Sequence, residues 1–212
     1  MINRFVVFEG IDRCGKRTQM ELVQRWLLER GFLVRTGREP NDETSLVGRY
    51  IRRILKKEVP GPGFHRLQRL FTLDRAQDIV CLIQPALDSG HFVLWERFAH
   101  STLAYGMLDG DPERYLKLQY DVIGPFMIWP SLTLVFDVSG EEAVKRMGGL
   151  EGAELFEKRD ILERVRQNYF ALAKDWPKSG LGEMVVVNGE RPPQEIFEEV
   201  KAIIKDRFQI VG

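Results

Sequence analysis

The sequence has two cysteines, no surplus of charge of either sign, and no long apolar run. Cys14 and Cys81 are too few for a disulfide framework and lack the spacing of metal ligands. The 31 basic and 31 acidic residues cancel, so no overall field attracts nucleic acid or an anionic membrane. No apolar stretch approaches the roughly 20 residues that cross a bilayer, and no cationic leader precedes the first apolar run. We therefore expect a cytoplasmic protein with no nucleic-acid or membrane partner.

What the chain does have is an alternation of short apolar runs with longer amphipathic ones. The runs that predict strands are 5–8, 32–36, 92–95, 132–138 and 184–187. Helical patterns cover 18–29, 45–57, 65–89, 102–108, 112–123, 141–146, 155–174 and 193–207. Near-continuous apolar strands separated by helices predict a parallel sheet that is covered on both faces. The expected fold is α/β, a three-layer sandwich around a five-stranded parallel sheet.

The chain length, 212 residues, suits one α/β domain with a core of its own. Glycine-bearing breaks at 59–63 and 147–152 are too short to be domain linkers. The second break precedes a charged helical pattern, which indicates a mobile flap. We expect a single domain over residues 1–212, with a lid around 147–160.

A glycine-rich loop follows the first predicted strand and opens the first predicted helix. Residues 10–18 read GIDRCGKRT, which matches the G-x-x-x-x-G-K pattern of a phosphate-binding loop. In such a loop the backbone N–H groups turn inward around phosphate oxygens, and the helix N-terminus adds partial positive charge. Lys16 would reach the outer phosphates of a nucleoside triphosphate. The full pattern continues with Ser or Thr, whose hydroxyl binds magnesium, but here that position is Arg17.

Charged residues also follow the second and third predicted strands. Arg38 begins an Arg-Glu-Pro triplet, which on its own is more typical of a surface turn. Glu96 and Arg97 end a buried strand, where unpaired charges are costly. Residues after parallel strands face the ligand crevice of such sheets. The pair therefore suits a site in which an arginine clamps phosphate and an acid positions magnesium, water or an attacking oxygen.

Phe71 and Arg75 lie four residues apart in a helical pattern and so share one helix face. An aromatic ring beside a guanidinium suits a planar base, because the ring can stack on the face of the base and the guanidinium can form hydrogen bonds with its edge. A core phenylalanine with a solvated arginine would give the same pattern. The pair by itself favours this second interpretation.

Taken in order, these motifs resemble those of thymidylate kinases, P-loop enzymes that phosphorylate dTMP with ATP. The matching segments are 8–13, 15–16, 18–19, 38–40, Phe71 with Arg75, 96–98, Ser101, 104–105, 156–158, 165–166 and Tyr169. Together they cover nearly the whole chain. The resemblance implies ATP- and magnesium-dependent in-line phosphoryl transfer that converts dTMP to dTDP, a step of dTTP biosynthesis. It also implies a homodimer, and the apolar-rich segment 67–87 is compatible with either an interface helix or a core helix.

The resemblance assigns roles on the acceptor side. Asp12 would approach the sugar 3′-hydroxyl, and Tyr105 would crowd the ribose 2′ position. Phe71 would stack on thymine while Arg75 donates to its O4, and Arg97 would hold the acceptor phosphate. The implied dTMP-binding residues are Asp12, Arg38, Arg52, Phe71, Arg75, Arg97, Ser101, Thr102 and Tyr105.

On the donor side, Arg13 lies where one branch of the family places an arginine that reaches the γ-phosphate. Arg146 resembles the arginine that lies against adenine, and the turn 188–192 would complete that pocket. The implied ATP-binding residues are Gly10, Ile11, Asp12, Arg13, Cys14, Gly15, Lys16, Arg17, Thr18, Arg146 and Arg191. The implied catalytic residues are Arg13, Lys16, Glu96 and Arg97, with Glu96 acting on magnesium through water.

Three positions depart from the family pattern. Arg17 either turns outward, so that water completes the metal's shell, or replaces part of the metal's charge. Glu96 stands where the family usually has Asp, and Gly106 where many members have a polar side chain near the base. These departures leave open a related kinase with altered base preference, or a nucleotide-binding homologue with impaired catalysis.

Overall fold

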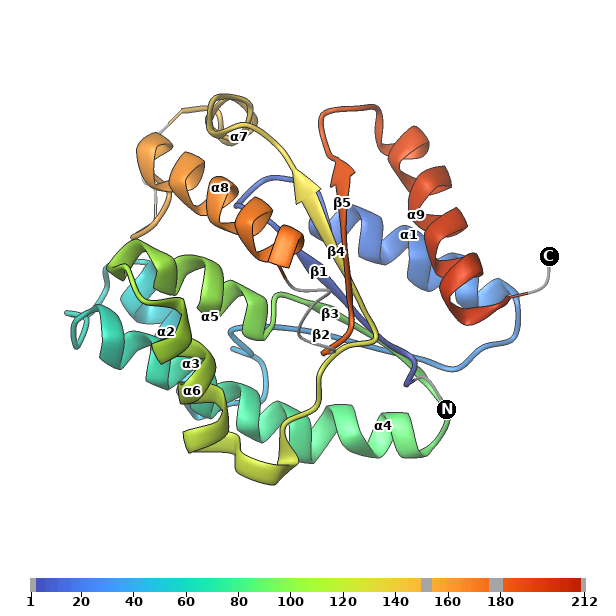
Figure 1. The fold of residues 1–212 in the computed structure, drawn as a ribbon, viewed down its shortest axis with the longest axis horizontal. Coiled ribbons are helices and arrows are strands. Elements are labelled where there is room, and N and C mark those ends of the chain that lie inside the picture. The colour runs from blue at the N-terminus through green and yellow to red at the C-terminus, as the bar shows by residue number, and fades with distance from the viewer. Residues whose placement is uncertain (1–2, 150–153, 176–180, 211–212) are drawn as a thin grey trace.

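A computed structural model of the protein describes residues 3–149, 154–175 and 181–210 (Figure 1). At the centre of this part lies a sheet of five parallel strands in the order β2-β3-β1-β4-β5. The strands are β1 (Phe5–Glu9), β2 (Val34–Arg38), β3 (Phe92–Glu96), β4 (Leu132–Asp137) and β5 (Glu183–Asn188). Each coincides with one predicted apolar run to within two residues. The predicted parallel sheet is confirmed.

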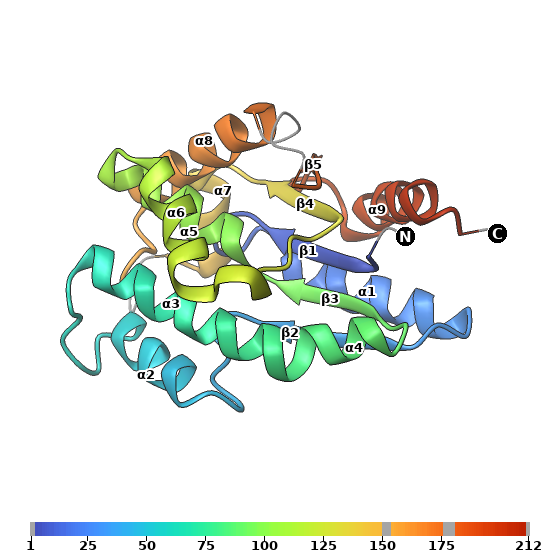
Figure 2. The ribbon, with the colours of Figure 1, turned by 60° about the horizontal axis from the view of Figure 1, so that its bottom comes forward.

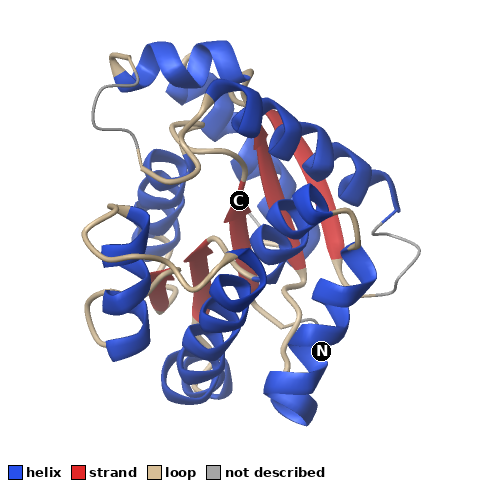
Figure 3. Cartoon of the chain, turned by 90° about the vertical axis from the view of Figure 1, so that its left-hand side faces the viewer, coloured by secondary structure: helices blue, strands red, loops and turns tan. Residues whose placement is uncertain are grey.

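Helices cover both faces of the sheet (Figures 1 and 3). They are α1 (Lys16–Glu29), α2 (Leu46–Leu55), α3 (Phe64–Asp78), α4 (Gln84–Asp88), α5 (Ala99–Gly106), α6 (Pro112–Ile123), α7 (Gly140–Met147), α8 (Arg159–Asp175) and α9 (Pro193–Phe208). Figure 2 shows α1 beside α9 and, on the other side of the sheet, α3 continuing toward α4. Within the described ranges, no helix is both long and apolar enough to span a bilayer.

Alternate side chains of β1 enter two different cores. Val6 and Phe8 pack with α1 residues such as Val23, whereas Phe5 and Val7 pack with the segment that follows α3. Both sets are fully buried, so the strand has no solvent-facing side. This two-sided burial explains why the strand sequences are continuously apolar rather than alternating.

The predicted helix 65–89 is not continuous. After α3 the chain forms a π-helical segment, Ile79–Ile83, and only then the short helix α4. Pro85 lies in the first turn of α4. Proline has no N–H and its ring clashes with the carbonyl four residues earlier, so the regular hydrogen-bond pattern cannot pass through it. A wider π turn just before the proline accommodates this break.

The predicted helix 155–174 begins later than expected, at Arg159. Before it, the Leu155 N–H donates to the carbonyl of Leu55 at the end of α2, 3.0 Å away. Leu155 and Phe156 also pack on the small core between α2 and α3. Tertiary contacts therefore keep this segment out of the helix. The predicted lid, 147–160, includes residues 150–153, which lie outside the described residues.

The carboxyl ends of the strands meet at one edge of the sheet. Glu96 lies in register with both Phe8 of β1 and Arg38 of β2. Just past the strands, the Arg97 N–H donates to the carbonyl of Phe8, and the Glu39 N–H donates to that of Glu96. The parallel sheet thus brings the phosphate-loop motif and both charged motifs to the same edge.

Two buried aspartates of α3 hold the loop that follows β2. The backbone N–H of Asn41 donates to Asp74 at 2.8 Å, and the Asn41 side-chain amide donates to Asp78 at 2.6 Å. Burial raises the pKa of Asp78 to about 7; the Asn41 hydrogen bond and the charges of Arg75 and Arg35 oppose this rise, and Asp74 adds to it. A carboxyl with a raised pKa binds its proton more tightly in the native state than in the unfolded chain.

We expect Asp78→Asn to change how stability depends on pH. Below about pH 4 both states hold the proton, whereas between pH 4 and 7 only the native state does, so the free energy of unfolding falls as pH rises. Between pH 5 and pH 8, titration of this group should lower the free energy of unfolding of the wild type by about 2–3 kcal/mol. The variant lacks the group and should not show this decrease. Urea unfolding at both pH values measures the difference.

The exposed Asp121 of α6 provides a matched control, because among the described residues its ion-pair partner is Lys117 at the surface. Asp121→Asn should leave the pH dependence of unfolding unchanged. Equal pH dependence in wild type and Asp78→Asn would contradict the assignment of this effect to Asp78.

Candidate active site

A cavity of about 510 Å³ opens at the edge of the sheet where the strands end. The sequence-predicted site residues that line it are Asp12, Arg13, Gly15, Lys16, Arg17, Thr18, Arg38, Arg52, Phe71, Arg75, Glu96, Arg97, Ser101, Thr102, Tyr105 and Arg146. Gly10, Ile11 and Cys14 are buried in the loop behind its wall. Arg191 is not among the described residues that line it. One cavity therefore brings together residues predicted for both substrates.

The glycine-rich loop has the tight curvature that its sequence predicts. Gly10 and Gly15 have φ values of 130° and 94°, which L side chains rarely adopt. A Cβ on Gly10 would also lie 2.7 Å from the carbonyl oxygen of Phe136. The Lys16 ammonium lies inside the curve of the loop, where it donates to the carbonyls of Gly10 and Ile11 at 3.2 and 2.7 Å.

Arg17 points away from the centre of the loop. Its Nε donates to Glu21, one turn further along α1, at 2.9 Å, and its side chain is 72% exposed. The acidic residue at this spacing gives the guanidinium a partner on the outer surface of the helix. Of the two arrangements considered from the sequence, this geometry is the outward one.

Arg97 and Asp12 form an ion pair at the junction of the loop and β3. Arg97 Nη2 lies 2.6 Å from Asp12 Oδ1, and Nη1 donates to the Gly10 carbonyl. Burial pushes the pKa of Asp12 upward, but the charges of Arg97 and Lys16 outweigh it and hold the pKa below its ordinary value. The Tyr105 ring lies under the Arg97 guanidinium, with its centroid 5.7 Å away. The aspartate is therefore kept as a carboxylate beside the cation.

Glu9 is a site residue that the sequence reasoning missed. It ends β1, is fully buried, and accepts the backbone N–H groups of Phe98 and Ser101 at 2.8 and 3.0 Å. Its second oxygen accepts the hydroxyls of Ser101 and Tyr169. These bonds attach the start of α5 to the end of β1 and leave the Ser101 hydroxyl engaged. The available signal was a charge that ends a buried strand, which is the argument applied to Glu96.

The same contacts explain a shifted helix boundary. α5 begins at Ala99, three residues before the predicted start of 102, because Glu9 accepts two of its N-terminal N–H groups. Arg97 lies between β3 and this helix with a φ of 65°, a conformation that is strained for a side-chain-bearing residue. The hydrogen bonds on both sides of it hold its guanidinium toward the loop.

Arg38 and Arg52 converge on one carboxylate in the cavity wall. Arg38 Nη2 lies 2.6 Å from Asp42 Oδ1, and Arg52 Nε lies 3.4 Å from Asp42 Oδ2. Burial raises the pKa of Asp42, but the two arginines outweigh it, so the pKa lies below its ordinary value. A shared acid thus holds two cations side by side, an arrangement suited to binding a phosphate group.

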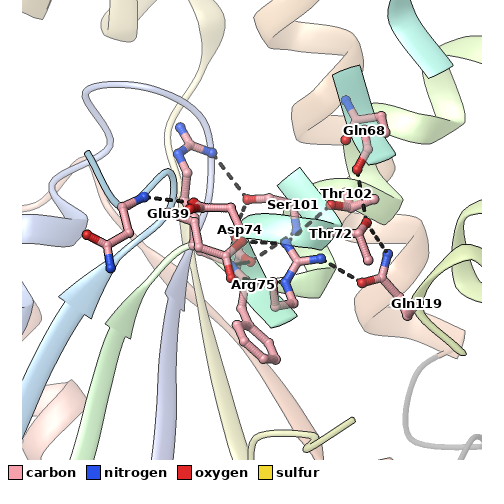
Figure 4. A network of polar contacts seen from close by, with 12 residues as sticks. Glu39, Gln68, Thr72, Asp74, Arg75, Ser101, Thr102 and Gln119 are labelled. Carbon is pink, nitrogen blue, oxygen red and sulfur yellow. Dashed lines mark hydrogen bonds and ion pairs between the residues drawn. The ribbon is translucent and has the colours of Figure 1, made fainter. Parts of the chain in front are cut away.

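Arg75 is fully buried, which rules out the solvated arginine considered from the sequence. Figure 4 shows it at the centre of a polar network: Nε and Nη2 form a fork on the Glu39 carboxylate, and Nη1 donates to Gln119 at 2.6 Å. Burial raises the pKa of Glu39, and the Arg75 charge opposes that rise. Phe71, one turn earlier on α3, lines the same cavity. Because Phe71 and Arg75 lie on the same face of α3, both form part of the cavity wall.

Arg146 bridges the loop and the turn after β5. Its Nη2 donates to the Gly189 carbonyl at 3.1 Å, and Nη1 donates to the Arg13 carbonyl at 3.4 Å. Arg191 turns toward α9, where it pairs with Glu199 and donates to the Asn188 carbonyl. The structure thus brings Arg146, but not Arg191, to the cavity.

The third departure, Gly106, has a packing explanation. A Cβ at this position would lie 2.4 Å from the ring of Tyr115, which comes from α6 and is fully buried. The Tyr115 hydroxyl donates to Asp109 at 2.8 Å. An aromatic ring from a neighbouring helix therefore occupies the volume that a side chain at 106 would need.

Comparison with known proteins identifies the family of the chain. The family model described as thymidylate kinase matches residues 8–200. Thymidylate kinase of Nitratidesulfovibrio vulgaris (strain DSM 19637 / Miyazaki F) is 37% identical over 217 residues, which cover 95% of each chain. Thymidylate kinase of Thermoanaerobacter sp. (strain X514) is 32% identical over 97% of this chain and 98% of its own. A probable thymidylate kinase of Thermococcus gammatolerans is 31% identical over 96% and 97%. Since these matches extend over almost the whole chain, the protein belongs to the thymidylate kinase family.

Proposed function

We propose that the protein transfers the γ-phosphoryl group of ATP to dTMP, which yields dTDP and ADP. The observation that carries this proposal is the cavity in which the phosphate loop faces the arginine and aromatic side chains of β2, α3 and α5. Transfer between two nucleotides depends mainly on positioning them in line and on neutralising charge. Membership of the thymidylate kinase family supports the same reaction.

At the donor end, the loop 10–18 holds the phosphates of ATP. The Lys16 ammonium lies within the loop, where it can exchange its carbonyl contacts for phosphate oxygens. Arg13 lines the cavity and supplies a second cation for the γ-phosphate. Arg146 flanks the adenine, since it already joins the loop to the turn after β5.

At the acceptor end, Arg38, Arg52 and Arg97 hold the phosphate of dTMP. Their acidic partners, Asp42 and Asp12, fix them in the cavity wall and keep the local charge balanced. The Arg97 contact is the catalytic one, because its guanidinium lies next to the phosphate loop and so between the two nucleotides. Cations in this place stabilise the charge that develops on the transferred group.

The sugar and base lie deeper in the cavity. Asp12 accepts the 3′-hydroxyl, and the Tyr105 ring beside it fills the space that a 2′-hydroxyl would need. Phe71 stacks on the base and Arg75 donates to it. Thr102 provides a further contact to the base, because the Ser101 hydroxyl already donates its hydrogen bond to Glu9.

The residues present are compatible with Mg²⁺ held mainly by substrate phosphates. No cluster of three or more His, Cys, Asp or Glu able to hold a metal occurs in the part of the chain that the structure describes. Glu96 offers one carboxylate at the cavity wall, next to Arg97 and the loop. Mg²⁺ typically binds through one or two carboxylates, several waters and substrate phosphates. When bound it would neutralise phosphate charge, with Glu96 holding its waters.

We propose a single functional domain in which segment 147–160 serves as a lid. Glu154, Phe156 and Glu157 line the cavity, which supports a covering role for the described part of this segment. Closing a lid excludes water and so limits hydrolysis of ATP. The cytoplasmic location inferred from the sequence stays a prediction.

Turnover of candidate acceptors tests the proposal directly. We expect purified protein with ATP and magnesium to form dTDP from dTMP and to use dCMP, dAMP and dGMP poorly. A coupled assay for ADP, with the products identified by chromatography, provides the measurement. Turnover of another monophosphate while dTMP is ignored would favour a kinase with altered base preference, and binding of both substrates without turnover would favour the impaired homologue.

Arg17→Thr should lower the magnesium concentration needed for half-maximal activity. The arginine already points outward, so its replacement removes no contact inside the loop and adds a hydroxyl in place to bind the metal. Arg17→Gln removes the same charge without that hydroxyl and should leave the magnesium requirement near that of the wild type. Loss of activity in both variants would instead mean that the arginine supplies charge that the metal otherwise provides.

We further propose that two copies associate through the outer surface of α3 and the π segment. Leu73 and Val80 are 48% and 57% exposed there, which is costly for large apolar side chains. Light scattering should give twice the chain mass of 24.6 kDa, and Leu73→Glu with Val80→Glu should give the monomer. Leu33→Glu, at another exposed leucine before β2, should leave the dimer intact. A monomeric wild type would contradict the proposal.

A further inference from the structure

The donor groups of Arg75 are almost all engaged by the protein. Nε and Nη2 donate to the two Glu39 oxygens, Nη2 also donates to Thr102 Oγ1 at 3.3 Å, and Nη1 donates to Gln119 Oε1. A guanidinium has five N–H groups and accepts no hydrogen bond. Within the described part of the chain, the second N–H of Nη1 has no acceptor. One donor of a fully buried cation in the cavity wall is therefore left for a ligand.

The same bonds occupy the acceptors around Arg75. Both Glu39 oxygens, Thr102 Oγ1 and Gln119 Oε1 each receive one of its N–H groups (Figure 4). Glu39 and Thr102 line the cavity, so these acceptors beside Arg75 could otherwise receive a hydrogen bond from a base. While Arg75 stays in place, a base at this end of the cavity meets a donor rather than a free carboxylate.

Gln119 is locked in the orientation that keeps Arg75 there. It comes from α6 and is fully buried. Its amide Nε2 donates to the Tyr115 carbonyl at 3.1 Å and to Thr72 Oγ1 at 3.4 Å. Thr72 in turn donates to the Gln68 carbonyl, so its oxygen is available to Gln119. Since a carbonyl only accepts and a guanidinium only donates, the amide cannot flip without losing bonds at both ends.

We propose that Gln119 is a positioning residue that sets base preference through Arg75, which deepens the proposed dTMP kinase function and rests on it. By holding Nη1, Gln119 keeps the Glu39 carboxylate covered and directs the remaining N–H into the cavity. The site then accepts a pyrimidine with a carbonyl at position 4 and rejects one with an amino group there. An amino group would place its N–H against that of Arg75, whose neighbouring acceptors are already occupied.

Gln119→Met tests this role because methionine keeps the length of the side chain and removes the acceptor. Arg75 should then loosen from Glu39, whose carboxylate can receive an amino group. We expect the ratio of kcat/KM for dTMP to that for dCMP to fall about 10- to 100-fold, mainly through a higher KM for dTMP. The ratio of kcat/KM for dTMP to that for dUMP should stay within about twofold of its wild-type value, because both bases carry the 4-carbonyl.

Two further variants separate positioning from general damage. Thr72→Val removes one partner of Gln119 and keeps its bond to Arg75, so it should shift the dTMP-to-dCMP ratio in the same direction by less than about fivefold. Gln19→Met makes the same chemical change at a buried glutamine of α1 that donates to the Pro193 carbonyl. It should leave the ratio unchanged even if it lowers stability.

Calorimetric binding of dTMP and dCMP to wild type and Gln119→Met completes the test without requiring turnover. A wild type that prefers dTMP in binding but does not phosphorylate it would contradict the proposed function and leave the Gln119 comparison valid. An unchanged preference in folded Gln119→Met and in Thr72→Val, or an equal loss in Gln19→Met, would overturn the role of Gln119.

Discussion

The acceptor half of the cavity depends on the burial of a single cation, Arg75. Removing a guanidinium from water costs several kcal/mol, which hydrogen-bonding and charged partners must offset. The fork on Glu39, the amide of Gln119 and the hydroxyl of Thr102 supply that set from the loop after β2, from α6 and from α5. Because these partners come from separate elements, meeting the needs of Arg75 also fixes how those elements pack around the base end of the cavity.

The junction between the phosphate loop and the acceptor side relies on a second group of buried charges, at the ends of the strands. Glu9 receives four hydrogen bonds and fastens the start of α5 to β1. That attachment holds Arg97 in a strained backbone conformation against Asp12 and the phosphate loop. Strain at a functional residue persists only where the surroundings determine it fully. The two groups thus share one principle, in which a carboxylate positions a cation to which we assign a phosphate or a base as ligand.

Much of this architecture could be read from local sequence, and the exceptions are instructive. The five strands were predicted because burial on both faces leaves a continuous apolar pattern. The helix 65–89 was predicted as continuous because periodicity does not register the effect of Pro85 on the hydrogen-bond ladder. The helix 155–174 was predicted to begin too early in the chain, because Leu155 and Phe156 pack against the core between α2 and α3 instead. Glu9 was overlooked because its partners are about 90 to 160 residues away in the chain.

The sequence by itself determined the family, the α/β fold and the phosphate loop, since these depend on short patterns and on their order along the chain. Only the tertiary structure decided what the charged side chains do. It turned Arg17 outward to Glu21, enclosed Arg75 within its partners and filled the space beside Gly106 with Tyr115. The reason is physical: a local pattern records which side chain is present, whereas its direction and free donors depend on partners that folding brings from distant segments.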